Sequence, residues 1–175
     1  EIGGRSIGER NLTYFIAEIG NNHNGDLDIA KRLIDGSVAA GADCAKFQLR
    51  DLRSLYNPRI EHDISGDLGS QYTLDLLRRF QLSDDDLFRA FDYCAAKGIT
   101  PLCTPWDTAS LRKLEDFGMA AYKIASADFT NHDLLAEVAA TTKPLICSTG
   151  MATEAEVLQG ICVLNAEAAS YVLLH

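Results

Sequence analysis

Short apolar segments alternate with longer amphipathic ones along most of the chain. The apolar segments are rich in β-branched and aromatic residues, a composition that favours buried strands. They predict strands over residues 14–19, 44–49, 100–104, 121–125, 144–147 and 171–174. Because these segments are apolar throughout rather than alternating, they indicate a parallel sheet that is covered on both faces.

Helices are predicted between the strands, where apolar residues recur at helical spacing. They cover residues 27–40, 83–97, 110–117, 132–140 and 153–165. Ser83 with Asp86 and Thr153 with Glu156 have the spacing of capping boxes at two helix starts. Residues 50–80 are polar and irregular, which predicts a long loop that is either functional or disordered.

Alternating strands and helices fit both a doubly wound sheet and a (β/α) barrel. The polar residues favour the barrel, because five different strands carry them at or just past their C-terminal ends. These residues are Glu18, Lys46, Gln48, Thr104, Lys123, Ser126 and Ser148. No Gly-x-Gly-x-x-Gly motif follows the first strand, which weighs against a dinucleotide-binding fold. We therefore predict an α/β fold, a TIM-type (β/α) barrel truncated to about six strands, with residues 1–11 as a small hairpin over the opposite end.

The composition is that of one globular domain, since 47% of the 175 residues are hydrophobic and 23% are charged. The net charge of −9 argues against a nucleic-acid partner or an anionic membrane. No apolar run is long enough to span a membrane, and the N-terminal residues lack the pattern of a signal peptide. The five cysteines form no Cys-x-x-Cys pair, so we expect buried free thiols and a cytoplasmic protein.

Two lysines lie inside otherwise apolar predicted strands. Lys46 and Lys123 would be costly to bury unless each meets an anion. Each could instead reach the rim of the sheet or pair with Glu18. Since both lie near strand C-termini, they indicate a shared site for phosphate or carboxylate, and a Schiff-base role is a further alternative.

Other polar residues share the predicted mouth of the barrel. Ser126 and Ser148 could donate hydroxyl groups to a phosphate, although each also fits an ordinary turn. Glu18 could act as a general acid or base. The polar residues 21–25 could hold sugar hydroxyls, and Trp106 could wall a pocket or cover the core. The four histidines have no metal-ligand spacing.

Seven short motifs occupy residues 15–20, 22–25, 46–48, 104–107, 123–126, 148–151 and 173–175. In this order and spacing, they resemble the N-acetylneuraminate (sialic acid) synthase family. The resemblance implies a (β/α) barrel that joins phosphoenolpyruvate to N-acetylmannosamine or a related amino sugar and releases phosphate. It also implies a divalent metal, Mn or Mg, that activates the sugar aldehyde.

The resemblance implies roles for individual residues by motif position. Those that would hold phosphoenolpyruvate are Lys46, Lys123, Ser126 and Ser148, with Lys123 also counted as catalytic. Glu18 would assist proton or water chemistry at the reacting carbon, while Gln48 and Thr104 would line the site. Asp128 stands where the family often has glutamate, and its shorter reach favours substrate binding over a direct catalytic contact.

The resemblance also predicts what this sequence does not contain. Residues 1–175 correspond to the N-terminal portion of the barrel, without its last two strands and the two metal-binding histidines they carry. A C-terminal antifreeze-like domain, which helps close a partner subunit's site, is expected in a homodimeric full-length enzyme. We therefore expect these residues by themselves to be inactive. Two alternatives remain: a Schiff-base aldolase of similar barrel shape, and a non-catalytic module that binds a phosphorylated metabolite.

Overall fold

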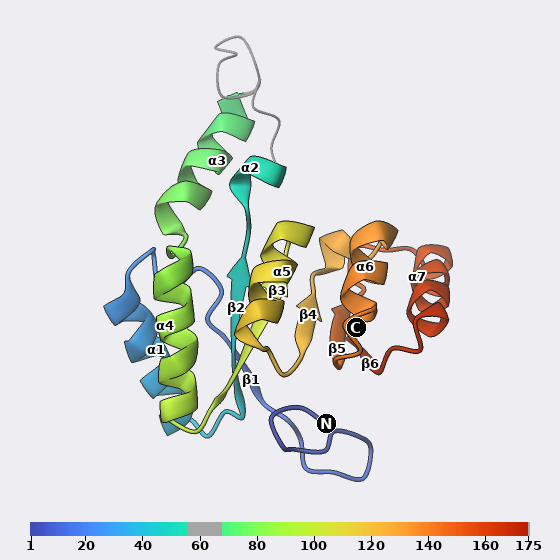
Figure 1. Ribbon diagram of the computed structural model, residues 1–175, viewed down its shortest axis with the longest axis horizontal. Helices are drawn as coiled ribbons and strands as arrows, with labels where there is room; N and C mark the ends of the chain where they lie inside the picture. Colours follow the sequence, from blue (N-terminus) through green and yellow to red (C-terminus); the bar gives the residue numbers. More distant parts are fainter. Residues whose placement is uncertain (56–67, 175) are drawn as a thin grey trace.

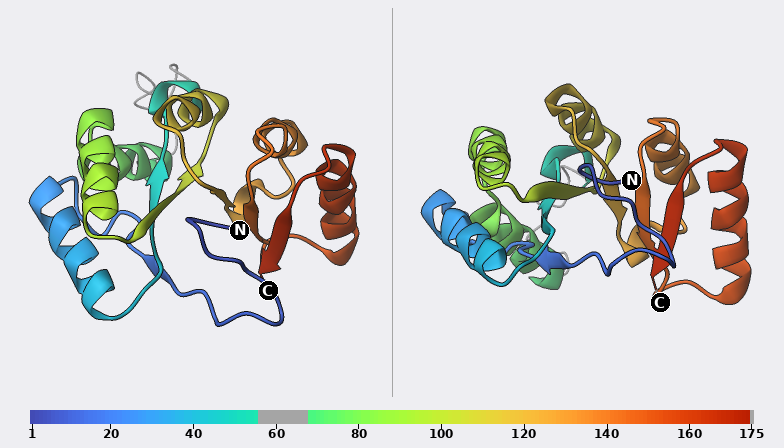
Figure 2. Two further views of the ribbon diagram at one scale, coloured as in Figure 1. Left: turned by 60° about the horizontal axis from the view of Figure 1, so that its bottom comes forward. Right: turned by 90° about the horizontal axis from the view of Figure 1, so that it is seen from below.

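Six parallel strands form one sheet in chain order, β1-β2-β3-β4-β5-β6. The computed structural model describes residues 1–55 and 68–174, with backbone alone for residues 68–73. The strands are β1 (Ile16–Glu18), β2 (Cys44–Leu49), β3 (Thr100–Pro105), β4 (Tyr122–Ile124), β5 (Leu145–Ser148) and β6 (Tyr171–Leu174). The sheet curls, and helices line its outer side (Figures 1 and 2). This is the predicted (β/α) barrel truncated to six strands, with β1 and β6 at the two edges of the sheet.

The helices follow the strands in the expected alternation. They are α1 (Leu27–Ala39), α2 (Leu52–Leu55), α3 (Leu68–Phe80), α4 (Asp84–Ala96), α5 (Thr108–Phe117), the 3-10 helix η2 (Ser126–Asp128), α6 (His132–Ala139) and α7 (Glu154–Ala166). Thr153 and Glu156 form the predicted capping box at the start of α7. Ser83 caps α4 by accepting from the Asp86 N–H, but the Asp86 carboxylate accepts from Arg89.

The prediction of one irregular loop over residues 50–80 is wrong at both ends, where α2 and α3 form. Leu74 and Leu77 lie three residues apart in α3, and Leu74 is 3% exposed, so this helix does bury a narrow apolar face. The signal was weak because polar residues dominate the segment. The centre of the predicted loop, residues 56–67, lies outside the described residues.

A small apolar cluster closes the N-terminal end of the sheet. Ile2, which is 3% exposed, packs there with Cys44, Leu102, Ala121 and Ile146. An antiparallel bridge joins Ile2 to Arg5, and the N-terminal segment crosses this end of the sheet in Figure 2. The predicted hairpin over the end opposite the polar residues is therefore confirmed for residues 2–5, but residues 6–11 form no strand.

The main core lies between the sheet and its helices. Phe47, Cys103 and Tyr122 point into it from neighbouring strands and are fully buried. The expectation of buried thiols holds for the cysteines on β2, β3, β5 and α4, but it is wrong for Cys162. Cys162 lies one helical turn after the exposed Leu158, on the outer face of α7.

Candidate active site

Strand register gathers the polar residues on the inner face of the sheet. Side chains alternate between the faces of a strand, so residues paired across parallel strands share a face. Glu18 pairs with Lys46, and Gln48 pairs with Thr104 in the next layer. Lys123 pairs with the apolar Ile146, one layer below Ser148. The C-terminal ends of these strands are called the mouth below.

Lys46 forms an ion pair at the mouth. Its side chain is 8% exposed, and its Nζ lies 2.9 Å from Glu18 Oε2 and 3.5 Å from Thr104 Oγ1. The ion pair with Glu18, which was the alternative to an anion-binding role for Lys46, is thus present. It compensates the cost of burying the ammonium group, which would be severe without a partner. The Glu18 side chain remains 55% exposed, so its carboxylate is accessible from the mouth.

Lys123 is held by neutral oxygens beside a second positive charge. Its Nζ donates to Ser148 Oγ and to the Ile124 carbonyl oxygen, both at 2.6 Å. Burial, and then the nearby charge of Lys46, lower the pKa of Lys123 to about 8. An anion placed between the two lysines would stabilise both ammonium groups, whereas an unliganded site leaves them repelling each other.

Gly20 brings Glu18 and Gln48 together. The N–H groups of Ile19 and Gly20 both donate to the Lys46 carbonyl oxygen at 3.0 Å, which fixes the chain after β1. Gly20 has a φ of +51°, and a Cβ there would lie 2.9 Å from Glu18 Oε1 and 3.3 Å from Gln48 Nε2. Only glycine fits this close approach without displacing the two side chains.

Ser126 and Asp128 lie beside the mouth in η2, just beyond β4, rather than on the sheet. Both are half-buried. Burial raises the pKa of the Asp128 carboxyl, and the charge of Arg50 opposes this shift. Among the described residues, the buried Asp128 Oδ2 has no hydrogen-bond partner. This oxygen therefore retains the capacity to accept a hydrogen bond.

Arg50 is a site residue that the sequence patterns did not single out. Arg50 Nη2 donates to Gln48 Oε1 at 2.5 Å, and its guanidinium lies 4.3 Å from the Trp106 ring centroid. The available signal was alternation, because Arg50 follows Gln48 by two residues and so continues its face. Trp106 lines a cavity of about 460 Å³ with Leu55 and residues of α5 and α6, as its predicted role as a pocket wall requires.

The described residues contain no group of three or more His, Cys, Asp or Glu side chains placed to hold a metal ion. His23, the histidine of the β1–α1 loop, is 2% exposed, and its Nδ1 accepts from the Gly25 N–H at 3.1 Å. This hydrogen bond ties the ring to the turn that it belongs to. No helix over residues 1–55 and 68–174 is long and apolar enough to cross a membrane.

Comparison with known proteins identifies the family. The family model of the NeuB family matches residues 33–175. The chain belongs to the NeuB family. N,N'-diacetyllegionaminic acid synthase of Campylobacter jejuni is 31% identical over 93% of this chain and 51% of its own length. Human N-acetylneuraminate-9-phosphate synthase is 32% identical over 85% of this chain and 42% of its own length.

A solved structure shares the fold over the whole chain. The N-acetylneuraminic acid synthetase of Leptospira borgpetersenii, in complex with citrate, superposes with a TM-score of 0.88 and 28% identity. The match covers 100% of this chain and 57% of that one. The NeuB-family chain spans about half the length of the curated relatives it matches.

Proposed function

We propose that this NeuB-family chain forms part of the active site of a synthase that makes a sialic-acid-like nonulosonic acid. The enzyme would condense phosphoenolpyruvate with N-acetylmannosamine or a related amino sugar and release phosphate. Relatives named as sialic acid and legionaminic acid synthases support this class of product. The observation that carries the proposal is the pair of lysines at one mouth, the buried Lys46 and the half-buried Lys123.

The proposed binding step follows from charge. The phosphate and carboxylate of phosphoenolpyruvate would lie against the ammonium groups of Lys46 and Lys123, with hydroxyl groups of Ser126 and Ser148 as further donors. Ser148 Oγ already accepts a hydrogen bond from Lys123, so a ligand oxygen that accepts one from the Ser148 hydroxyl would extend an existing hydrogen-bond chain. Charge-assisted hydrogen bonds of this kind are about twice as strong as neutral ones.

The proposed chemical step needs a group that can move a proton. A carbon–carbon bond forms between phosphoenolpyruvate and the aldehyde carbon of the sugar, and water then replaces the phosphate. Glu18 is suited to assist the proton and water chemistry, because its carboxylate is exposed at the mouth while Lys46 fixes its position. Gln48, Thr104 and Asp128 would line the same space.

A divalent metal, Mn or Mg, would supply Lewis-acid activation of the sugar aldehyde. Its ligands would have to come from residues outside those described, which hold no suitable cluster. A homodimer, which would close each site with the partner subunit, is part of the same proposal.

The reaction can be tested directly in the full-length enzyme. Incubation with phosphoenolpyruvate, a panel of amino sugars and Mn or Mg should release one phosphate for each nonulosonic acid detected by mass spectrometry. Glu18→Gln keeps the side-chain shape and removes its charge, so it should lower kcat more than it raises KM for phosphoenolpyruvate. Phosphoenolpyruvate binding without any product would favour a non-catalytic metabolite-binding module.

A Schiff-base aldolase is the second candidate, because the lowered pKa of Lys123 makes its neutral amine accessible near neutral pH. Borohydride traps an imine as a stable secondary amine. Treatment of the enzyme with pyruvate and borohydride should leave the mass of the Lys123 peptide unchanged if the synthase proposal is correct. A stable pyruvyl adduct on Lys123 would favour the aldolase.

A further inference from the structure

The side-chain amide of Gln48 is held in one orientation by a neighbour on the same strand face. Arg50 Nη2 donates to Gln48 Oε1 at 2.5 Å. Since a guanidinium has donors only, this hydrogen bond assigns the oxygen to Arg50 and leaves the Nε2 donor for the other side. Gln48 Nε2 and Glu18 Oε1 then flank the same point above Gly20, at 3.3 and 2.9 Å from where a Cβ would stand.

Arg50 is itself fixed by the two turns that follow β2 and β3. Its guanidinium stacks 4.3 Å from the Trp106 ring centroid, and its carbonyl oxygen accepts from Gln81 Nε2 at 2.8 Å. The residue after Arg50 is held as well, because the Asp51 N–H donates to the buried Asp107 carboxylate at 2.8 Å.

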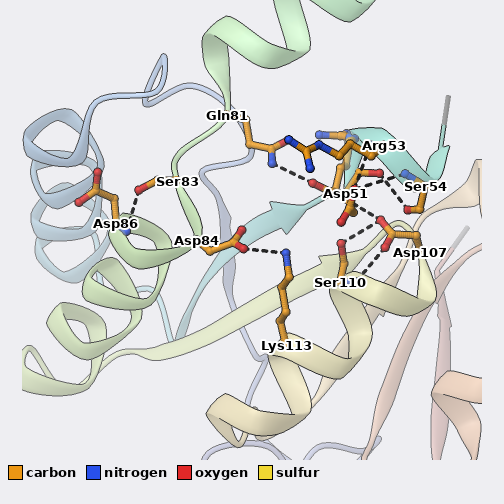
Figure 3. Close-up of polar contacts among 11 residues, drawn as sticks. Asp51, Arg53, Ser54, Gln81, Ser83, Asp84, Asp86, Asp107, Ser110 and Lys113 are labelled. Carbon is orange, nitrogen blue, oxygen red and sulfur yellow. Dashed lines mark hydrogen bonds and ion pairs between the residues drawn. The ribbon is translucent and has the colours of Figure 1, made fainter. Parts of the chain in front are cut away.

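Asp107 also ties this turn to the start of α5. It accepts from the Ser110 N–H and hydroxyl at 2.7 and 2.8 Å, so one carboxylate joins the β2–α2 turn to the β3–α5 turn (Figure 3). The turn that carries Arg50 is thus anchored on three sides, by Trp106, Gln81 and Asp107.

We propose that Arg50 is a positioning residue that turns the Gln48 amide so that its N–H donors face the ligand. The ligand group opposite must then be an acceptor, such as a carbonyl or hydroxyl oxygen of the amino sugar, lying between Gln48 and Glu18. This inference rests on the proposed synthase function for the identity of the ligand. The orientation of the amide rests on the geometry alone.

The kinetic test uses the full-length enzyme with Arg50→Met, which keeps the side-chain length and removes the donors. A free amide can rotate and present its oxygen, so KM for the amino sugar should rise about three- to tenfold, while kcat/KM for phosphoenolpyruvate changes by less than about twofold. Arg50→Lys keeps one donor and should recover part of the loss. Arg53→Met is the matched control. Arg53 lines a cavity of about 560 Å³ together with Arg50, but it donates to Asp51 Oδ1 through its backbone N–H, which the substitution keeps, so this variant should behave as wild type.

A double-variant cycle separates positioning from a general structural effect. If Arg50 acts through Gln48, then Arg50→Met combined with Gln48→Ala should be no worse for the amino sugar than Gln48→Ala alone. Additive losses, or equal KM values for Arg50→Met and Arg53→Met, would overturn the proposal. Melting temperatures of all variants identify any loss that comes from unfolding.

A measurement that does not depend on catalysis tests the orientation of the Gln48 amide separately from the proposed function. The NMR order parameter of the Gln48 side-chain amide nitrogen should be high in the wild-type protein and fall in Arg50→Met but not in Arg53→Met. If the wild-type enzyme makes no sugar acid, the proposed function fails, and the inference about Gln48 is still decided by this measurement. Equal order parameters in the two variants would contradict the proposal that Arg50 positions the Gln48 amide.

Discussion

At the scale of single residues, two lysines with different partners share the mouth. Lys46 has a carboxylate partner, Glu18, and lies deep in the sheet. Lys123 has neutral oxygen partners, and the charge of Lys46 adds to the effect of burial on its pKa. An anionic ligand is therefore expected to depend most on the protonation of Lys123.

The first prediction is a pH limit on phosphoenolpyruvate use. Lys123 binds an anion only in its charged form, and its pKa is lowered to about 8. The charged form is present below this pKa and is lost above it, so kcat/KM for phosphoenolpyruvate should fall as the pH rises through about 8. Lys123→Arg stays charged and should remove this alkaline limb.

Neutral substitution tests the same site at constant pH. Lys123→Ala and Lys46→Ala should each lower kcat/KM for phosphoenolpyruvate about ten- to a hundredfold or more. If the lysines serve only the fold, the variants that still fold should instead keep near-normal kinetics and show lowered melting temperatures. Kinetics and melting temperatures are therefore measured together.

The second prediction concerns His23. Burial lowers the pKa of His23 below its usual 6.5 because it deprives the charged ring of solvation, and a hydrogen bond with the Gly20 backbone opposes this shift. Protonation at Nδ1 would also remove the acceptor that the Gly25 N–H uses. The unfolded chain takes up the proton first as the pH falls, so the stability that the neutral ring supplies is complete above pH 6.5 and is lost below it.

Urea unfolding at several pH values between about 7 and 5 measures this loss. His23→Asn keeps an acceptor oxygen near the position of Nδ1 and does not titrate, so its stability should fall less over the same range. Parallel pH curves for the two proteins would show that His23 does not control the acid sensitivity.

At the scale of elements, close packing decides which helices tolerate a larger residue. α7 approaches the segment after η2 at Gly160, where a Cβ would lie 2.5 Å from Cε1 of the fully buried Phe129. Gly36, in the last turn of α1, is exposed and has nothing within 4 Å of the same position. Substitution of glycine by alanine should therefore lower the stability of the protein at position 160 and raise it at position 36.

The third prediction is that Gly160→Ala destabilises the protein by about 1–3 kcal/mol, since the buried ring cannot move aside. Gly36→Ala should stabilise it by up to about 1 kcal/mol, because alanine loses less backbone entropy in a helix. Denaturant midpoints of the two variants provide the measurement. Equal changes of the same sign would show that α7 does not pack as described.

At the scale of the whole molecule, the curled sheet has two edges, β1 and β6. Val172 and Leu174 of β6 lie in register with the inner-face residues Ile146 and Ser148. They are 43% and 39% exposed. Apolar side chains next to unpaired backbone groups favour contact with another strand.

The fourth prediction is that a polypeptide of residues 1–175 associates in solution and forms no sugar acid with added metal. Sedimentation at several concentrations should show an average mass that increases with concentration. The double substitution Val172→Lys and Leu174→Lys should reduce this increase. Product formation by this polypeptide would contradict the inactivity. A concentration-independent monomer would contradict the association alone.

Local patterns in the sequence determined the elements and their order. Apolar runs identified all six strands, and Thr153 with Glu156 marked the start of α7 because a cap depends on residues three positions apart. Polar residues at strand ends also predicted a common mouth, since parallel strands end at the same side of a sheet. α3 was missed because polar residues dominate its sequence.

Only the tertiary structure decided which side chains meet at the mouth. Lys46 and Thr104 are 58 residues apart, and Lys123 and Ser148 are 25 apart. The orientation of Gln48 depends on Arg50, and the place of Arg50 depends on turns after two different strands. Such contacts follow from strand register and helix packing, which bring distant segments together and which no periodicity within a segment encodes.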